Sequence, residues 1–413
     1  MRILRLATGG DGVGKLDDGR TVFVPRTAPG DLVRLRELRL AKKFARAAIA
    51  ELVEASPERV DPACPHYERE QCGGCQLQHC SMALQLAAKR TMVGEALRRI
   101  AKLDVPDPEI EAADAAWGYR NKVTLAVGTG GRPIGFHRQG EAGNLFELTR
   151  CLIAEPGLMD LLSVVRAHRA HLPPDAEQLV LRLDRQGVRH LTVRVRGQTA
   201  WGGAAVLHQA LAARGVPAII WWEPEGGAPR AVAGSKDPWP VAAFEQVNPL
   251  MGDRIRSWAV SHLGSLEGLM AWDLYAGIGE TTALLAAAGA TVQSVEVDAR
   301  AVREGARRGP EAGVVRHVGR AEDVAPRLSA PDVVITNPPR TGMDGRVTDA
   351  IVAARPRRVA YVSCDPATLA RDLSRLLSHL PASPPLRLAQ LRAFDLFPQT
   401  AHVETVAILE AEG

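Results

Sequence analysis

The chain has 413 residues, of which 46% are hydrophobic and 24% charged, with a net charge of +4 and a pI of about 8.8. A chain of this length is too long to fold around one ordinary hydrophobic core, so two or three domains are predicted. The composition excludes a disordered or fibrous protein. No stretch approaches about 18 uninterrupted apolar residues, and the first residues lack a signal-peptide core, so we expect a cytoplasmic protein with no membrane contact.

Residues 1–55 are expected to form a small β-barrel. The stretch "GKLDDGRTVFVP" contains an Asp-Gly hairpin signal, and "GDLVRLREL" alternates in polarity as a strand does. Basic residues crowd the stretch "VRLRELRLAKKFARA", with Glu37 as the single opposing charge. Such a cluster suits contact with phosphates or, equally, a solvated charged face.

Residues 56–240 begin with a turn-rich segment that holds most of the cysteines. Cys64, Cys72, Cys75 and Cys80 fall close together, while Cys151 and Cys364 stand apart. Because cytosolic thiols stay reduced, a clustered set favours a metal over disulfides. A helix is predicted over 81–103, followed by a mostly antiparallel sheet with a hairpin that turns at Gln186 and Gly187.

Residues 241–413 alternate between apolar strands and Ala-rich helices, which predicts a buried parallel sheet. The final segments "LRLAQLRAFDLF" and "HVETVAIL" have no helix between them, so they are expected to pair antiparallel at the sheet edge. A parallel sheet that closes in a reversed hairpin is, by analogy, the layout of class I methyltransferases.

Several motifs fall where the strands of this region end. In "WDLYAGIGETT", Gly277 and Gly279 come directly after a strand and before a helix, where a ligand can approach the backbone. Glu296 ends the next strand, at the place of an acidic residue that accepts ribose hydroxyls. Asp323 follows the third strand as a candidate adenine contact, and Asn337 opens an Asn-Pro-Pro turn after the fourth. This order favours a methyl-donor site over a nicotinamide site.

Cys364 lies in "YVSCDPATLARD", between an apolar strand and a predicted helix start. Asp365 suits the N-cap and Pro366 the first helical position, so the thiol is expected beside electropositive amides that lower its pKa. The alternative is a small buried residue that ends a strand.

The motifs "DLYAGIGE", "VEVD", "TNPPRTG", "YVSCDPATLARD" and "FDLFPQTAHVETVAIL", in this order, resemble the RNA uracil-5 methyltransferase family. Its members methylate uridines of tRNA or ribosomal RNA with S-adenosylmethionine. Upstream, "GDGVG" through "GDLVRLREL" is similar to the family's RNA-binding TRAM domain. The stretch "CPHYEREQCGGCQLQH", with Cys151, is similar to the four-cysteine iron–sulfur site of its cluster-bearing members.

The resemblance implies a fold with three parts. These are an OB-like TRAM β-barrel (1–55), a central, mostly antiparallel α+β domain with the four-cysteine site (56–240), and an α/β class I (Rossmann-like) methyltransferase domain with an antiparallel C-terminal hairpin (241–413). Cys364 matches the family's nucleophile and Glu404 its general base. Contacts to S-adenosylmethionine are implied for Gln246, Tyr275, Glu280, Glu296 and Asn337, and less directly for Asp323.

Two positions depart from the family pattern, because members usually carry Asp at position 337 and Asn at position 365. The extra carboxylate of Asp365 is expected to raise the pKa of the neighbouring thiol, against the effect of the helix terminus. Glu404, near an apolar strand, is expected to have a raised pKa that suits a base.

For the metal, the resemblance implies a [4Fe–4S] cluster on Cys64, Cys72, Cys75 and Cys151, with Cys80 left out. The two-residue spacing between Cys72 and Cys75 suits zinc as well, so zinc remains an alternative.

The expected partner is RNA, with ribosomal RNA favoured over tRNA, and the target uridine is expected to be unpaired or flipped out. We expect a monomer. Two other functions remain open from the sequence: an RNA-binding protein with a decayed catalytic domain, and an amino-group nucleic-acid methyltransferase, in which Asn-Pro-Pro precedes an aromatic residue where Arg340 stands here.

Overall fold

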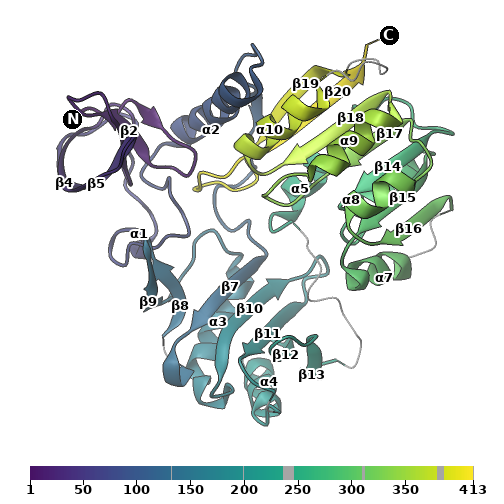
Figure 1. The fold of residues 1–413 in the computed structure, drawn as a ribbon. Helices are drawn as coiled ribbons and strands as arrows, with labels where there is room; N and C mark the ends of the chain where they lie inside the picture. Colours follow the sequence, from purple (N-terminus) through teal and green to yellow (C-terminus); the bar gives the residue numbers. More distant parts are fainter. Residues whose placement is uncertain (132, 199, 236–245, 309–311, 379–385, 413) are drawn as a thin grey trace.

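Three β-sheets organise the chain in the computed structural model, which describes residues 1–131, 133–198, 200–235, 246–308, 312–378 and 386–412 (Figure 1). The N-terminal sheet, the central sheet and the C-terminal sheet follow one another along the chain. Within the described ranges, every helix is too short or too polar to cross a membrane.

The N-terminal sheet has the strand order β1-β2-β3-β5-β4 and curls into a small rounded unit (Figure 1). Its core is made of small aliphatic side chains such as Val22, Val24 and Val33, as the alternating pattern predicts. The strands are β1 (Arg5–Leu6), β2 (Gly12–Lys15), β3 (Thr21–Val24), β4 (Leu32–Leu40) and β5 (Phe44–Glu54).

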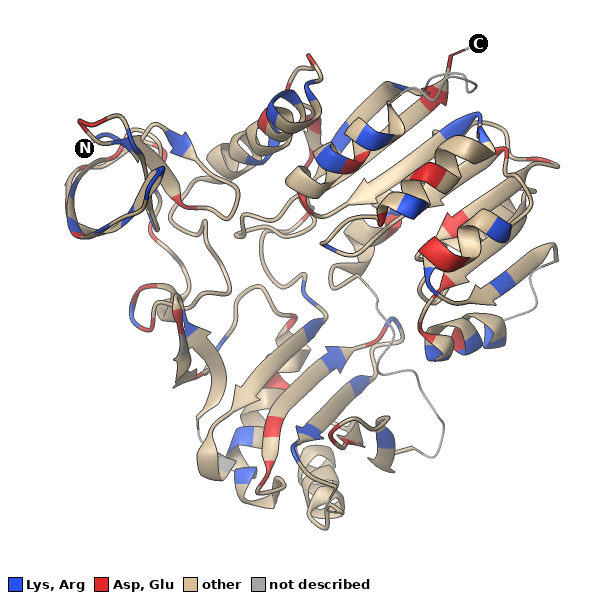
Figure 2. Ribbon diagram, viewed as in Figure 1, with Lys and Arg blue, Asp and Glu red and all other residues tan. Residues whose placement is uncertain are grey.

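The exposed basic cluster of this sheet lies along β4, β5 and the turn between them (Figure 2). Arg34 pairs with Glu51 at 2.7 Å across the two strands, and Arg36 pairs with the adjacent Glu37. Part of its positive charge is therefore already balanced within the sheet.

The segment that follows carries the clustered cysteines and then the predicted helix. After α1 (Pro65–Glu68), α2 (Met82–Ala96) continues into a π-helical turn, η1 (Leu97–Ala101), which confirms the helix expected over 81–103. Ser81 caps α2 by accepting a hydrogen bond from the Leu84 amide at 3.1 Å. The short β6 (Glu109–Glu111) then pairs parallel with a strand of the C-terminal sheet.

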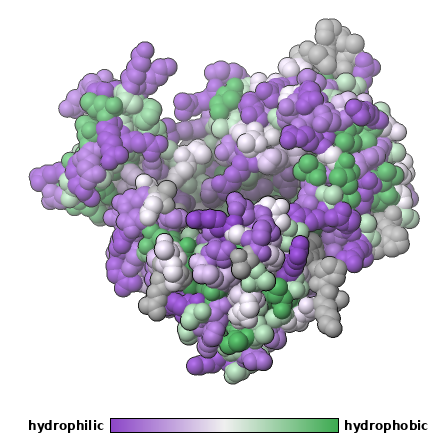
Figure 3. Space-filling model, turned by 60° about the horizontal axis from the view of Figure 1, so that its bottom comes forward, coloured by the Kyte–Doolittle hydropathy of each residue, from purple (hydrophilic) through white to green (hydrophobic). Residues whose placement is uncertain are grey.

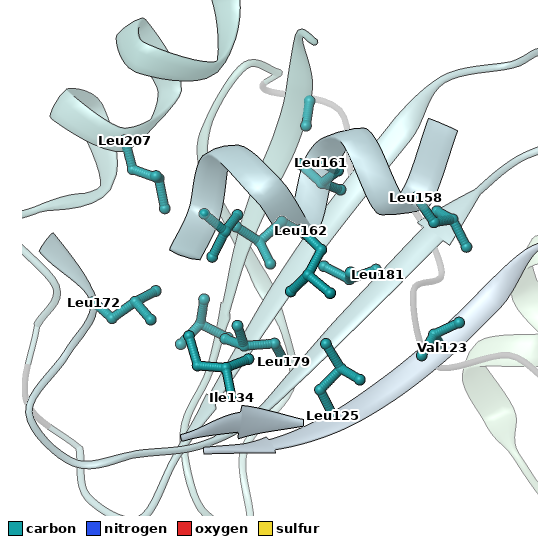
Figure 4. Close-up of a cluster of buried hydrophobic side chains, with 14 of the residues drawn as sticks. Val123, Leu125, Ile134, Leu158, Leu161, Leu162, Leu172, Leu179, Leu181 and Leu207 are labelled. Carbon is teal, nitrogen blue, oxygen red and sulfur yellow. The ribbon is translucent and has the colours of Figure 1, made fainter. Parts of the chain in front are cut away.

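The central sheet has the order β13-β12-β11-β10-β7-β8-β9 and is antiparallel except between β11 and β12. The predicted hairpin is confirmed, because Gln186 and Gly187 lie in the turn between β10 and β11. Leucines of α3 and α4 pack onto one face of the sheet (Figure 4). Its elements are β7 (Lys122–Val127), η2 (Thr129–Gly131), β8 (Ile134–Arg138), β9 (Glu141–Glu147), α3 (Pro156–Ala167), η3 (Arg169–His171), β10 (Ala176–Leu183), β11 (Arg189–Val195), α4 (Ala204–Ala213), β12 (Ala218–Glu223) and β13 (Arg230–Ala233).

The C-terminal sheet has the order β16-β15-β14-β17-β18-β20-β19-β6. Its strands are parallel from β16 to β18, and β20 runs antiparallel to both β18 and β19, as the sequence predicts. The elements are α5 (Pro249–Ser261), β14 (Met270–Leu274), α6 (Glu280–Ala287), β15 (Thr291–Glu296), α7 (Ala299–Arg307), β16 (Val314–Val318), α8 (Ala321–Val324), η4 (Ala325–Arg327), β17 (Val333–Thr336), α9 (Gly345–Ala354), β18 (Arg358–Ser363), α10 (Pro366–Leu376), β19 (Leu386–Phe394) and β20 (Glu404–Ala411).

One feature of this sheet differs from the expectation: β19 is not an edge strand, because β6 pairs alongside it. A three-residue strand with two glutamates is too short to show an alternating pattern, so the sequence gives no sign of it. The domain limits at residues 55 and 240 stay predictions, and the second limit lies outside the described residues.

Candidate active site

Cys364 and Glu404 are brought together by the antiparallel pairing of β18 with β20. Ser363 lies opposite Thr405, so the next position along places Cys364 opposite Glu404, although 40 residues separate them in the chain. Cys364 is partly buried, whereas Glu404 is only 2% exposed. The predicted nucleophile and base therefore share one end of the sheet.

The helix start after Cys364 forms as predicted. The Asp365 side chain accepts hydrogen bonds from the Ala367 and Thr368 amides at 2.9 and 2.8 Å, and Pro366 is the first residue of α10. The thiol thus lies next to a capped helix N-terminus.

The predicted lowering of the Cys364 pKa is wrong, because the pKa is raised to about 11. Burial is the largest cause, and the nearby Glu404 carboxylate adds to it. Asp365 raises the pKa further, as expected from its extra charge, while Arg340 opposes the rise. Burial and two nearby carboxylates raise the pKa of Cys364 more than the helix terminus lowers it. The local sequence does not reveal this burial.

Burial raises the pKa of Glu404 to about 8, which confirms the expected direction. Arg340 opposes this rise, so one guanidinium lowers the pKa of both the thiol and the carboxyl group. Arg340 is itself exposed and has neither a hydrogen bond nor an ion pair to any residue that the structure describes. Its charge therefore acts on Cys364 and Glu404 and remains available to a ligand.

No role was predicted for His402, which lies two residues before Glu404. Burial lowers its pKa to about 4, and Arg340 contributes to the shift. The imidazole is therefore neutral at physiological pH. Its position in the "HVET" motif, close to the predicted base, is the feature of the sequence that could have drawn attention to it.

A second group of predicted residues lines a cavity at the carboxyl ends of β14 and β17, with an enclosed volume of about 50 Å³. Five predicted cofactor residues contribute to its wall, namely Gln246, Tyr275, Gly277, Glu280 and Asn337. The glycine turn after β14 has the conformation for which glycine is favoured, with φ of 58° at Gly277 and 88° at Gly279. Tyr275 also has a positive φ, 63°, which is rare for a residue with a side chain.

Two acidic residues fix the geometry around this turn. Glu296 accepts hydrogen bonds from the amides of Gly277 at 2.9 Å and Asp298 at 2.8 Å, which places its carboxylate beside the glycine turn. Glu280 is held by two arginines, Arg185 at 2.9 Å and Arg256 at 3.1 Å.

Three predicted cofactor residues, Gly279, Glu296 and Asp323, are not part of the cavity wall. The half-exposed carboxylate of Asp323 pairs with Arg346 at 3.1 Å. Asp273, which the sequence analysis did not single out, lines the cavity and accepts a hydrogen bond from Thr282 at 2.6 Å. Burial raises the pKa of Asp273 to about 7. Its place directly before the glycine turn in "WDLYAG" was the available signal.

The four predicted metal-binding cysteines, Cys64, Cys72, Cys75 and Cys151, line one cavity of about 410 Å³. Burial raises the pKa of Cys72 to about 11 and of Cys75 to about 12, and that of Cys151 also rises. Cys80 is buried outside the cavity wall. Within the described part of the chain, no three His, Cys, Asp or Glu side chains are arranged to hold a metal ion.

Gln246, Arg340 and His402 also contribute to the wall of this cavity, whereas Cys364 and Glu404 do not. Gln246 belongs to the walls of both cavities. The face of the molecule in Figure 3 is largely hydrophilic, with apolar residues in scattered patches.

Comparison with known proteins gives two family matches. The family described as tRNA (Uracil-5-)-methyltransferase matches residues 311–412, and the TRAM domain matches residues 2–50. The first match includes both Cys364 and Glu404.

Relatives match along nearly the whole chain. An RNA methyltransferase of Thermosynechococcus vestitus is 34% identical, over 99% of this chain and 97% of the relative. The 23S rRNA (uracil(1939)-C(5))-methyltransferase of Chromohalobacter salexigens is 31% identical, over 99% of this chain and 88% of the relative. The crystal structure of Pyrococcus abyssi tRNA (uracil-54, C5)-methyltransferase with S-adenosyl-L-homocysteine has a TM-score of 0.74 and 22% identity, over 99% of both chains. The chain therefore belongs to the RNA uracil-5 methyltransferase family, with an N-terminal TRAM domain and a class I methyltransferase fold.

Proposed function

We propose that this protein forms 5-methyluridine in RNA through a temporary covalent bond between Cys364 and C6 of the target uracil. The observation that carries the proposal is the β18–β20 pairing, which places a partly buried thiol opposite a buried carboxyl group. A nucleophile and a base at one strand end are what substitution at C5 of uracil requires.

The chemistry begins at Cys364. Its thiolate adds to C6 of uracil, which forms an S–C6 bond and moves an electron pair of the ring toward C5 and O4. The electron-rich C5 then takes the methyl group. The Glu404 carboxylate removes the proton from C5, the C5–H electrons restore the C5=C6 double bond, and the S–C6 bond breaks to release the Cys364 thiolate.

Arg340 stabilises the negative charges that this series of reaction steps requires. Both acting groups are needed as anions, yet burial favours their neutral forms. The guanidinium lowers the pKa of each, so it stabilises the thiolate before attack and the carboxylate before proton removal.

S-adenosylmethionine, when bound, supplies the methyl group. We propose that it binds at the cavity between β14 and β17, where the donor set suits a nucleoside with an amino acid tail. The carboxylate of Glu296, held beside the glycine turn, is the proposed contact to the ribose, and Asp273 and Gln246 offer polar atoms in the wall. Tyr275, Gly277, Gly279, Glu280 and Asn337 complete the proposed contacts. Asp323 is kept as a proposed contact from outside the cavity wall, where its carboxylate pairs with Arg346.

The substrate is proposed to be ribosomal RNA, since the relative that acts on 23S rRNA matches the chain from end to end. The P. abyssi protein acts on tRNA, which makes tRNA the second candidate. In either RNA the target uridine must leave its stack, because stacking hides C6 from a thiol.

We further propose that Cys64, Cys72, Cys75 and Cys151 hold a [4Fe–4S] cluster, with zinc as the alternative. The support for this proposal is that all four thiols line one cavity, where burial raises the pKa of Cys72, Cys75 and Cys151. In the described part of the chain these thiols are not drawn together into a metal-binding arrangement, so a bound cluster would have to bring them closer. A bound cluster would supply cross-links between the cysteine segment and Cys151, since methyl transfer needs no electron.

The overall function is tested by methylation of RNA from cells that lack the protein. Purified protein with S-adenosylmethionine should restore 5-methyluridine at one uridine, located by mass spectrometry, and Cys364→Ala should abolish it. Restoration in tRNA but not in ribosomal RNA would correct the proposed substrate. Methylation at an exocyclic amino group would overturn the reaction itself.

A further inference from the structure

The loop between β19 and β20, residues 395–403, carries the chain directly into Glu404; we call it the base loop. It contains no helix or strand, although Thr400 donates from its amide and its hydroxyl to the Phe397 carbonyl, at 3.2 and 2.8 Å. Buried contacts from segments far away in sequence also hold it.

Two residues on one face of the helix α2, Gln85 and Lys89, supply several of these contacts. Lys89 pairs with Asp395, both side chains being fully buried, and it also donates to the Phe397 carbonyl at 3.0 Å. One turn earlier, Gln85 accepts from the Gln399 amide at 2.9 Å and donates to the Gln399 side chain at 3.1 Å. A buried polar network of this kind favours one arrangement of the loop.

The cysteine segment supplies the next contacts. The Leu77 amide, two residues past Cys75, donates to the Gln399 carbonyl at 3.0 Å. Gln76 accepts from the Ala401 amide at 3.3 Å. Gln85 also donates to the carbonyls of Leu77 and Cys80, at 3.1 and 3.0 Å, so it ties the cysteine segment to the base loop.

Gln399 sits at the centre of this network in a strained conformation. Its φ is 69°, in the left-handed region that residues with side chains seldom adopt, and it is 4% exposed. Strain of this kind persists only where the surroundings fix it. Here its amide, its carbonyl and its side chain are all held by Gln85 and Leu77.

We infer that Gln85 and Lys89, together with residues 76–80, are positioning residues for Glu404. They clamp the base loop from outside the C-terminal sheet and so fix the carboxylate over C5 of the bound uracil. The inference rests on the proposed function, because it assumes that Glu404 removes the C5 proton. It assigns to α2 and the cysteine segment a part in one step of the reaction, the release of product.

The test separates the two halves of the reaction in the full-length protein. With 5-fluorouridine RNA and S-adenosylmethionine, adduct formation requires attack and methyl transfer but no base. With ordinary RNA, decay of the methylated covalent intermediate requires the base. Gln85→Met is expected to leave adduct formation within about twofold of the unmodified protein while slowing decay about tenfold or more, so that intermediate accumulates.

A second variant guards against misfolding. Lys89→Met leaves Asp395 buried without its partner, so Lys89→Met is combined with Asp395→Leu. The same selective slowing is expected. Arg99→Met, which removes an exposed cation from the turn after α2, is the control and should change neither rate.

Glu404→Gln separates this inference from the function on which it rests. If Glu404→Gln accumulates intermediate while both α2 variants release product normally, the positioning role is overturned and the base assignment stands. Equal slowing of both half-reactions in the α2 variants also overturns it, because that is the result of general destabilisation. If Glu404→Gln itself accumulates nothing, the base assignment falls and the positioning role falls with it.

Discussion

The carboxylate of Glu404 raises the pKa of the Cys364 thiol across the junction of β18 and β20. The two groups act in different steps of the proposed reaction. Repulsion between their negative charges disfavours both anions at once. Arg340 lowers both pKa values and sets how far the repulsion is relieved.

The raised pKa of Glu404 predicts a pH-dependent cost to stability. In the folded protein the carboxyl group keeps its proton up to about pH 8, against an ordinary value of 4.5. Between these values the folded state binds more protons than the unfolded state, so this contribution to stability falls as pH rises. Glu404→Gln should therefore raise the free energy of unfolding relative to the unmodified protein at pH 8 by up to a few kcal/mol, and by little at pH 4.5. Urea denaturation at the two pH values measures this, and an equal effect at both would contradict it.

Removal of the guanidinium at position 340 should shift the pH profile. In Arg340→Met the pKa of Cys364 and of Glu404 should both rise, because the cation that opposes burial is lost. Adduct formation with 5-fluorouridine RNA should slow about tenfold near pH 8 and recover in part at higher pH. Arg357→Met, which alters an exposed arginine at the other end of β18, is the control. A loss that is the same at every pH would show that Arg340 acts only by binding RNA.

Asp365→Asn tests the local charge beside the nucleophile. Asn retains the capping oxygen of α10 but lacks the negative charge, which raises the pKa of Cys364. Adduct formation should become a few-fold faster near pH 7.5, with thermal stability little changed. Asp365→Ala should remove the cap and lower the melting temperature. A slower reaction in Asp365→Asn would mean that the carboxylate serves another purpose.

The cysteines that line the cavity are expected to bind the metal, and Cys80, outside its wall, is not. Protein purified without oxygen should contain iron and acid-labile sulfide in amounts that match one [4Fe–4S] cluster. Cys72→Ala should lose both, whereas Cys80→Ala should keep them, because Cys80 lies outside the cavity wall. Stoichiometric zinc without iron would contradict the proposed cluster and would show that the four thiolates bind zinc.

The sequence predicted those features that depend on neighbours along the chain. The Asp365 cap, the turn at Gly277 and Gly279 and the reversed final strand all follow from local residue types, and the structure has each of them. The pKa of Cys364 was predicted in the wrong direction, because its burial and the proximity of Glu404 arise from packing between strands far apart in the sequence.

Long-range pairing accounts for the other differences as well. Asp323 follows its strand as expected, but its carboxylate pairs with Arg346 of α9 and is not part of the cavity wall. The base loop shows no regular pattern, and its conformation depends on Gln85 and Lys89, which lie about 300 residues earlier in the chain. Contacts between residues so far apart in the chain can be identified only from the folded structure.

The central claim is that the sulfur of Cys364 bonds to the target uracil. Protein incubated with S-adenosylmethionine and 5-fluorouridine RNA, then digested and examined by mass spectrometry, tests it most directly. We predict a single peptide, the one containing Cys364, that carries a methylated 5-fluorouridine nucleotide. A nucleotide attached to any other residue, or the same yield of adduct from Cys364→Ala, would contradict the account.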